Sequence, residues 1–234
     1  MILPLYFIIL MTSGLLHQPT EDTKIYQVKK IQSELDVTGK GNSPLWKNAT
    51  ELSDFTYPWE TQQPPFTSFK ALHSKDWFYC LFNVKDDNVN VYVVKNDKSE
   101  VVYSDRVEIF FRKDDRLSPY YGLELDPNAR ILDYKAEFPR KFNDTWTWPS
   151  GQLIVKANRT ADGYSVEIAI SKESLKQLEV LKNRKIEAGL FRANCLELNG
   201  ESEAHIKWIS WVKPDSKTPD FHIPSAFGVL ILQD

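Results

Sequence analysis

The chain has 234 residues, and its 29 Lys and Arg against 32 Asp and Glu give a formal net charge of −3. Because charges of both signs are interspersed, no basic stripe is present that would neutralise phosphates, and nucleic acid is excluded as an expected partner. Aromatic residues make up 13% of the chain, enough to fill a core and to leave rings for stacking on a flat ligand. A chain of this length fits one all-β domain.

The first 16 residues predict a secretion signal. The segment Ile2–Leu10 is apolar and uncharged, is too short to span a membrane, and is followed by small residues near Gly14. A buried N-terminal strand or helix is the alternative. We therefore expect a signal peptide at 1–16, a linker at 17–30, a β-sandwich at 31–234, and a secreted or periplasmic protein without a membrane span.

After residue 30, short segments of alternating apolar and polar residues are separated by turn residues. The predicted strands are Thr67–His73, Trp77–Val84, Arg106–Arg112, Tyr120–Asp126, Ile131–Phe138, Leu153–Ala157, Gly163–Ile170, Lys185–Cys195, Ile206–Val212 and Phe227–Leu232. Many short alternating strands with polar turns predict an all-β fold, an antiparallel β-sandwich of the jelly-roll kind.

One helix is predicted at Ser171–Leu181, packed across an end of the sandwich. Ser171 is a suitable N-cap, and Leu175, Leu178 and Leu181 fall on one stripe.

The alternation also predicts which side chains leave the core. In the strand Arg106–Arg112, Val107 and Ile109 share the core face, so that Arg106 and Glu108 project from the other face. Glu124 occupies the matching face of the next strand. These two glutamates are therefore candidates for a ligand-binding site.

Other potential sites have weaker signals. The four His are widely spaced, and no motif for a nucleotide, a metal or a catalytic nucleophile is present. Asp86 and Asp87 follow a strand and would suit calcium, although solvated turn residues are the favoured interpretation. Cys80 and Cys195 fall in strand interiors, which favours buried thiols over a disulfide.

Six segments carry a set of motifs in a fixed order. They are Pro44–Ala49, Ser104–Phe111, Tyr120–Pro127, Gly163–Glu167, Ile209–Trp211 and Pro224–Gly228. Together they resemble family 9 carbohydrate-binding modules over roughly 31–232. The resemblance implies a β-sandwich that binds soluble sugars or the ends of plant polysaccharide chains, and that works beside xylan- or cellulose-degrading enzymes. It also implies no cofactor other than a structural calcium.

In that family, two Trp side chains enclose the sugar. The matching neighbourhoods here hold Val102-Tyr103 and Phe221, and the family's binding-face Arg and Asn on the next strand are replaced by Gly122 and Glu124. A Tyr/Phe clamp is physically reasonable because the C–H face of a sugar stacks on any aromatic ring. The predicted binding residues are Tyr103, Arg106, Glu108, Glu124, Arg192, Asn194, Trp208 and Phe221.

Three functions remain open from the sequence. The first is a non-catalytic carbohydrate-binding module with a glycoside hydrolase as a partner. The second is a glycoside hydrolase that uses Glu108 and Glu124 as acid and base. The third is a surface module that docks a protein. Among the tryptophans, Trp211 is expected in the core, and Trp146 and Trp148 form either an exposed platform or buried loop anchors, with anchors favoured.

Overall fold

The computed structural model describes residues 23–200 and 203–234. The predicted signal peptide at 1–16 lies outside the described residues. The strands are β1 Ile25–Lys30, β2 Thr67–His73, β3 Trp77–Lys85, β4 Arg106–Arg112, β5 Tyr120–Leu125, β6 Ile131–Glu137, β7 Lys141–Asn143, β8 Leu153–Thr160, β9 Gly163–Ser171, β10 Leu181–Lys182, β11 Lys185–Leu198, β12 Ala204–Ser210 and β13 Gly228–Leu232. The helix α1 spans Lys172–Gln177, and 3-10 turns span Pro44–Asn48 (η1), Lys98–Tyr103 (η2) and Pro224–Ala226 (η3).

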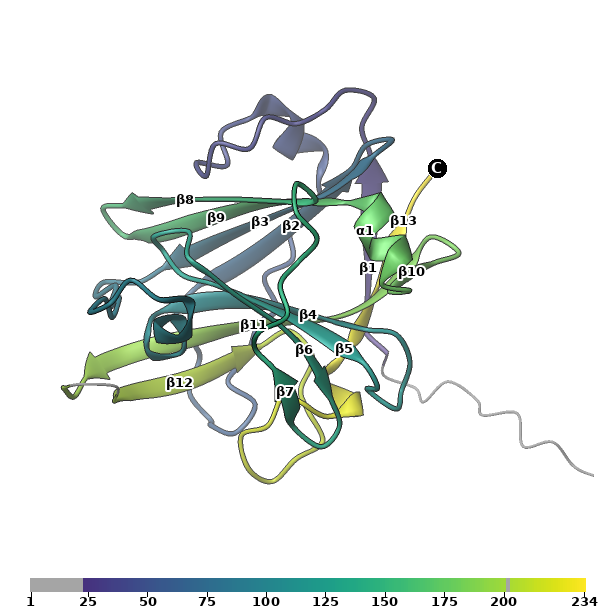
Figure 1. Ribbon diagram of the computed structural model, residues 1–234. Helices are drawn as coiled ribbons and strands as arrows, with labels where there is room; N and C mark the ends of the chain where they lie inside the picture. Colours follow the sequence, from purple (N-terminus) through teal and green to yellow (C-terminus); the bar gives the residue numbers. More distant parts are fainter. Residues whose placement is uncertain (1–22, 201–202) are drawn as a thin grey trace, which may run out of the picture.

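The strands form two packed layers, which confirms the all-β sandwich (Figure 1). The upper sheet in Figure 1 has the order β2-β3-β9-β8, and the lower sheet has the order β7-β6-β5-β4-β11-β13. Strands β10 and β12 also pair with β11. Among the described residues, no helix has the length and apolar character needed to cross a membrane.

Strand β1 corrects the prediction of a linker at 17–30. It pairs in parallel with β13 from Ile25 and with β2 at Lys30, so it joins the two sheets at their edge. The other described strand pairs are antiparallel. Tyr26 and Val28 are buried, whereas the lysines around them are exposed, which made this strand resemble a polar segment.

The predicted helix is shorter than expected. Ser171 caps it by accepting a hydrogen bond from the backbone N–H of Ser174, but the helix ends at Gln177. Glu179 has φ of +58°, which an α-helix cannot continue through. Leu181 then pairs with Ile186 as part of β10 instead of completing a helical stripe.

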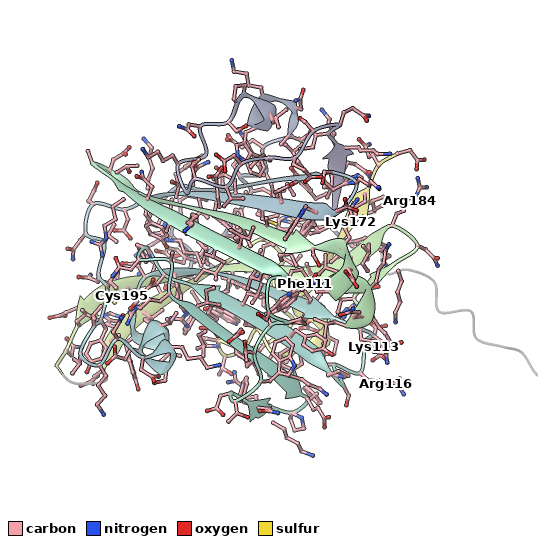
Figure 2. All side chains as sticks on the ribbon, turned by 45° about the horizontal axis from the view of Figure 1, so that its top comes forward. Phe111, Lys113, Arg116, Lys172, Arg184 and Cys195 are labelled. Atoms are coloured by element: carbon pink, nitrogen blue, oxygen red, sulfur yellow. The ribbon has the colours of Figure 1, made fainter. Side chains whose placement is uncertain are left out.

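The core between the sheets follows the predicted alternation. Val107, Ile109 and Phe111 of β4 are fully buried there, and Figure 2 shows Phe111 in the middle of the molecule. Trp211 is buried in the same core, as predicted. Cys80 and Cys195 are both buried and both free.

Trp146 and Trp148 are loop anchors. Trp148 is buried and its indole N–H donates to Oγ of Ser174 at 3.1 Å, and Trp146 packs on Tyr121 with ring centroids 5.2 Å apart. The exposed platform is therefore the wrong alternative.

A buried carboxylate ties the segment before β2 to the upper sheet. Glu167 of β9 is fully buried, and its Oε1 accepts the indole N–H of Trp46 at 2.7 Å. Its Oε2 accepts the backbone N–H of Gly39 at 2.6 Å and that of Thr38 at 2.8 Å. Both carboxylate oxygens of Glu167 are thus used for structure.

The outer face of the lower sheet, which points away from the upper sheet, carries a second apolar cluster. Phe110, Tyr120, Tyr134 and Phe191 project from its strands, and Phe221 covers them from the segment between β12 and β13. Figure 1 shows this segment, in yellow, passing below the lower sheet. The next features all lie on this face.

Candidate functional site

Three ionisable side chains form a polar floor on the outer face of the lower sheet: Arg106, Glu108 and Glu124. Arg106 and Glu108 alternate with the core residues of β4, and Glu124 of β5 is the direct cross-strand partner of Glu108. Nε of Arg106 lies 2.7 Å from Oε2 of Glu124 and 2.9 Å from Oε1 of Glu108. The three are buried, and the prediction that they project from the face opposite the core of the sandwich is confirmed.

Glu108 is the least satisfied member of the polar floor. The single Nε–H of Arg106 donates to Glu124, which leaves Oε1 of Glu108 buried without a hydrogen bond. Burial and the neighbouring Glu124 raise the pKa of Glu108 to about 8, although Arg106 opposes the shift. At neutral pH this carboxyl is therefore mostly protonated, and it can both donate and accept hydrogen bonds.

Two cavities lie against the polar floor. The narrow cavity has a volume of about 100 Å³ and contains the rings of Trp59, Trp208 and Phe221 in its wall. The wide cavity, about 710 Å³, is walled by aromatic rings that include Tyr103 and Phe142. Both are lined by Arg106 and Glu124. The wide cavity has the size of a typical small-molecule site, whereas the narrow one is much smaller.

The walls of the wide cavity carry accessible aromatic rings. Tyr103, from η2, packs edge-on against Tyr92 with ring centroids 5.3 Å apart. Phe142, from β7, is 46% exposed and rests edge-on against Tyr134 and His222. Both rings are held in place by other aromatic rings and retain surface for a ligand.

Gly122 of β5 is required by the aromatic packing. A Cβ on this residue would lie 2.2 Å from Cζ of Tyr134, because the Tyr134 ring crosses the strand at this point. The residue that departs from the family pattern thus makes room for a tyrosine in the wall of the wide cavity. Tyr134 is buried, and its hydroxyl lacks a hydrogen-bond partner among the described residues.

His222 lines both cavities and was not predicted. Its Nδ1 lies 2.9 Å from the hydroxyl of Tyr120, and its ring stacks on Phe110 with centroids 5.1 Å apart. Burial, and then the positive charge of Arg140, lower the pKa of His222 to about 4. It is therefore neutral near pH 7 and presents a hydrogen-bonding edge instead of a charge.

Trp208, one of the predicted binding residues, lines the narrow cavity. The guanidinium carbon of Arg106 lies 5.3 Å from the centre of its ring, a cation–π distance. Trp59, which sequence reasoning missed, contributes a second tryptophan from the loop before β2 and donates from its indole N–H to the carbonyl of Ser216 at 2.9 Å.

Phe221 differs from the predicted clamp. It lines the narrow cavity but is only 5% exposed, and its ring stacks on Phe191 at 4.1 Å with an interplanar angle of 12°. Trp208 and Trp59 pack on it at 5.7 and 5.3 Å. Phe221 therefore belongs to the packed cluster of the outer face and offers little surface for stacking.

We expect Phe221→Ala to lower the free energy of unfolding by about 3 kcal/mol, since it leaves a cavity among buried rings. Urea unfolding followed by tryptophan fluorescence measures the change. If Phe221→Ala instead kept its stability and lost ligand binding, Phe221 would be a clamp residue as the sequence predicted.

The structure does not place Arg192 and Asn194 in either cavity. Arg192 is the cross-strand partner of Val107, so it points into the space between the sheets, where it is fully buried. Its guanidinium pairs with Asp86 at 2.6 Å and with Oδ1 of Asn194 at 2.8 Å. Asn194 in turn donates to the hydroxyl of Tyr57. These two predicted binding residues form a structural network.

The residues around Asp86 do not fit a calcium site. The Asp86 carboxylate is used by Arg192 and by the backbone N–H of Asn88. In residues 23–200 and 203–234, no group of three or more His, Cys, Asp or Glu is arranged to hold a metal ion.

Comparison with known proteins identifies relatives of the whole sandwich. The sequence profile of the family described as "Carbohydrate family 9 binding domain-like" matches residues 37–234. No curated protein matches the chain at a significant level.

Three similar solved structures share the fold. A candidate carbohydrate-binding protein from Bacteroides uniformis has a TM-score of 0.67 at 19% identity, with 91% of this chain and 100% of that chain covered. A carbohydrate-binding module of family 9 from Caldicellulosiruptor kristjanssonii, in complex with glucose, has a TM-score of 0.59 at 18% identity, with 90% and 96% covered. A structure of a family 9 module from the same organism, in complex with cellotriose, has a TM-score of 0.59 at 18% identity, with 90% of this chain and 94% of that chain covered.

Proposed function

The chain belongs to the carbohydrate family 9 binding domain-like family, and we propose that it is a non-catalytic module that binds the end of a sugar chain in the wide cavity. The observation that carries this proposal is the combination of accessible aromatic walls with polar groups that line the same cavity: the paired Arg106 and Glu124, and the Tyr134 hydroxyl, which has no hydrogen-bond partner among the described residues. Sugars present apolar C–H faces and polar hydroxyl edges, and this cavity offers a partner for each.

Each part of the cavity has a role in the proposal. Tyr103 and Phe142 stack on the faces of one or two sugar rings and remove water from them. Glu124 and Arg106 are already paired, so they hold the polar floor rigid at little further entropic cost. The hydroxyl of Tyr134 gains from a ligand hydroxyl the hydrogen bond that the described residues do not provide.

The ligand class is inferred from the same features. A family 9 module from Caldicellulosiruptor kristjanssonii is found in complex with glucose and with cellotriose, and a cavity of about 710 Å³ has room for a short oligosaccharide end. We propose fragments or ends of plant polysaccharides as ligands, with a glycoside hydrolase as a partner in their breakdown. The apolar segment at the start of the sequence is the reason to place this binding outside the cytoplasm.

The geometry favours binding over hydrolysis. A glycosidase needs two carboxyl groups on opposite sides of the scissile bond. Glu108 and Glu124 are instead direct neighbours on adjacent strands, and both have an oxygen within 2.9 Å of Nε of Arg106. They therefore approach a ligand from the same side. A protein-docking role has less support, because the accessible rings line a concave cavity instead of a flat patch.

We expect Tyr103→Ala and Phe142→Ala each to weaken oligosaccharide binding by about tenfold to a hundredfold, since each removes an aromatic surface worth about 1–3 kcal/mol. Isothermal titration calorimetry with cello- and xylo-oligosaccharides measures the change. Stability should remain close to that of the wild type, because Phe142 is 46% exposed.

Phe138→Ala is the matched control for Phe142→Ala. Phe138 is 48% exposed and lies just after β6, but it does not line the wide cavity. Its removal should leave the dissociation constant unchanged. Equal losses in Phe138→Ala and Phe142→Ala, or hydrolysis of the same oligosaccharides by the wild type, would rule out the proposed function.

A further inference from the structure

A group of cationic side chains lies at one end of the sandwich and shares no residue with the two cavities described above. They come from the end of β1, the β2–β3 turn, α1 and the β10–β11 turn: Lys30, Lys75, Lys172, Lys176 and Arg184. Figure 2 shows Lys172 and Arg184 at the same end of the molecule, with Cys195 at the other.

These side chains surround a continuous hollow, here called the lysine cleft. One cavity of about 540 Å³ is lined by all five cations. A second cavity, of about 510 Å³, shares Lys75, Lys172 and Lys176 with the first. Among the described residues that line the first cavity, Asp234 carries the one carboxylate side chain, and it pairs with Arg184.

The remaining positive charge is only partly balanced, by Asp76 and Glu173, which line the second cavity. Lys30, Lys75 and Lys176 are exposed, and they form no ion pair with any residue in 23–200 or 203–234. The chain as a whole has a net charge of −3. The cleft is therefore a local concentration of cations in an acidic protein, and a concave wall focuses such a field on a bound anion.

Lys172 is held in the cleft by specific contacts. Nε2 of His73 lies 2.7 Å from the carbonyl oxygen of Gln233, so Nε2 carries the proton and Nδ1 is free to accept. Nζ of Lys172 lies 2.8 Å from that Nδ1 and also donates to the carbonyl of Ser74. Burial lowers the pKa of Lys172, and the nearby Lys30 and Lys176 lower it further, although Asp76 and Glu34 oppose the shift. A bound anion would relieve this repulsion.

The second cavity adds surfaces of another kind. Trp77 lines it and is partly exposed, and Gln152 and Gln177 line the same cavity, with amides that also bond to Ser171 and Glu173. An aromatic ring and amides in one cavity suit the face and hydroxyls of a sugar. The cleft therefore combines an anion-binding part with a part that fits a neighbouring sugar ring.

We infer that the lysine cleft is a second binding site, for an acidic carbohydrate whose oxyanion (a uronate or a sulfate ester) lies among Lys75, Lys172 and Lys176 while an adjacent ring packs on Trp77. This site is independent of the sugar proposed for the wide cavity. Together the two sites would let one module contact two parts of a polysaccharide, or two chains.

The test is calorimetric titration with an oligogalacturonate, a sulfated galactan oligosaccharide and an uncharged cello-oligosaccharide. We expect the triple variant Lys30→Gln/Lys75→Gln/Lys176→Gln to bind the acidic oligosaccharide about tenfold more weakly or worse, since three nearby charges are lost. The matched control is Lys40→Gln/Lys47→Gln/Lys156→Gln, which removes three exposed lysines elsewhere. The control and the wild type should bind alike, and more weakly at high salt.

Further arms separate this site from its alternatives. Tyr103→Ala should leave binding of the acidic oligosaccharide unchanged; a loss there would place that ligand in the wide cavity and overturn the inference. Inorganic sulfate that binds as tightly as the oligosaccharides would reduce the cleft to a simple anion site. Binding to phosphatidylglycerol vesicles but not to the oligosaccharides would make it a membrane contact. Equal affinities for the two triple variants would exclude the cleft altogether.

Discussion

Arg106→Ala is expected to lower the free energy of unfolding by about 3–5 kcal/mol, because it leaves two buried carboxyl groups without their cation. Glu108 and Glu124 are cross-strand partners, and both are within 2.9 Å of Nε of Arg106. Arg106 also donates to the carbonyl of Val102 at 2.8 Å, next to Tyr103. Its loss should therefore loosen η2 and weaken sugar binding as well. Urea unfolding and calorimetric titration measure the two effects.

Two controls distinguish the loss of this cation from a general loss of arginine. Arg116 pairs with Asp114 at the surface, with its side chain 81% exposed, so Arg116→Ala should have no measurable effect on stability. Arg106→Ala combined with Glu124→Gln should recover part of the lost stability, since one buried charge is then removed together with its partner. Additive losses in that double variant would show that Arg106 stabilises the sheet by packing alone.

The strands of the sandwich were predictable because one face of each is packed in the core. The alternation in β4 placed Arg106 and Glu108 on the correct face, and the same pattern in β5 placed Glu124. Strand β1 has only two buried side chains among lysines, so its alternation was too short to recognise. The end of α1 could not be predicted from the leucine spacing, since Leu181 is used by β10 instead.

The errors in the site have a physical cause in β11. From Ala188 to Cys195 every side chain of this strand is buried, because one face packs in the core and the other lies under the cluster around Phe221. Such a strand has no polar face, so the sequence does not reveal that Arg192 and Asn194 point inward. Phe142, Trp59 and His222 come from a three-residue strand and two loops, where no periodicity exists to detect.

Stability should fall as the pH rises from about 5 to 8, and Glu108→Gln should remove much of that fall. The pKa of Glu108 is raised from 4.5 to about 8, mainly by burial and then by Glu124. Between these values the folded protein keeps a proton that the unfolded chain has released, so each added pH unit costs up to about 1.4 kcal/mol. Burial also raises the pKa of Asp105, from 3.8 to about 7. Asp105 therefore adds a further fall in stability with rising pH, in a lower pH range.

The measurement is urea unfolding of the wild type and of Glu108→Gln at several pH values from 5 to 9. Because glutamine keeps the shape of the protonated carboxyl and has no proton to release, the variant should become the more stable protein near pH 8 by a few kcal/mol. Glu137→Gln, at the exposed end of β6, is the matched control and should follow the wild type. Parallel pH profiles for Glu108→Gln and the wild type would show that Glu108 is ionised in the folded protein throughout, with Arg106 shared evenly between the two glutamates.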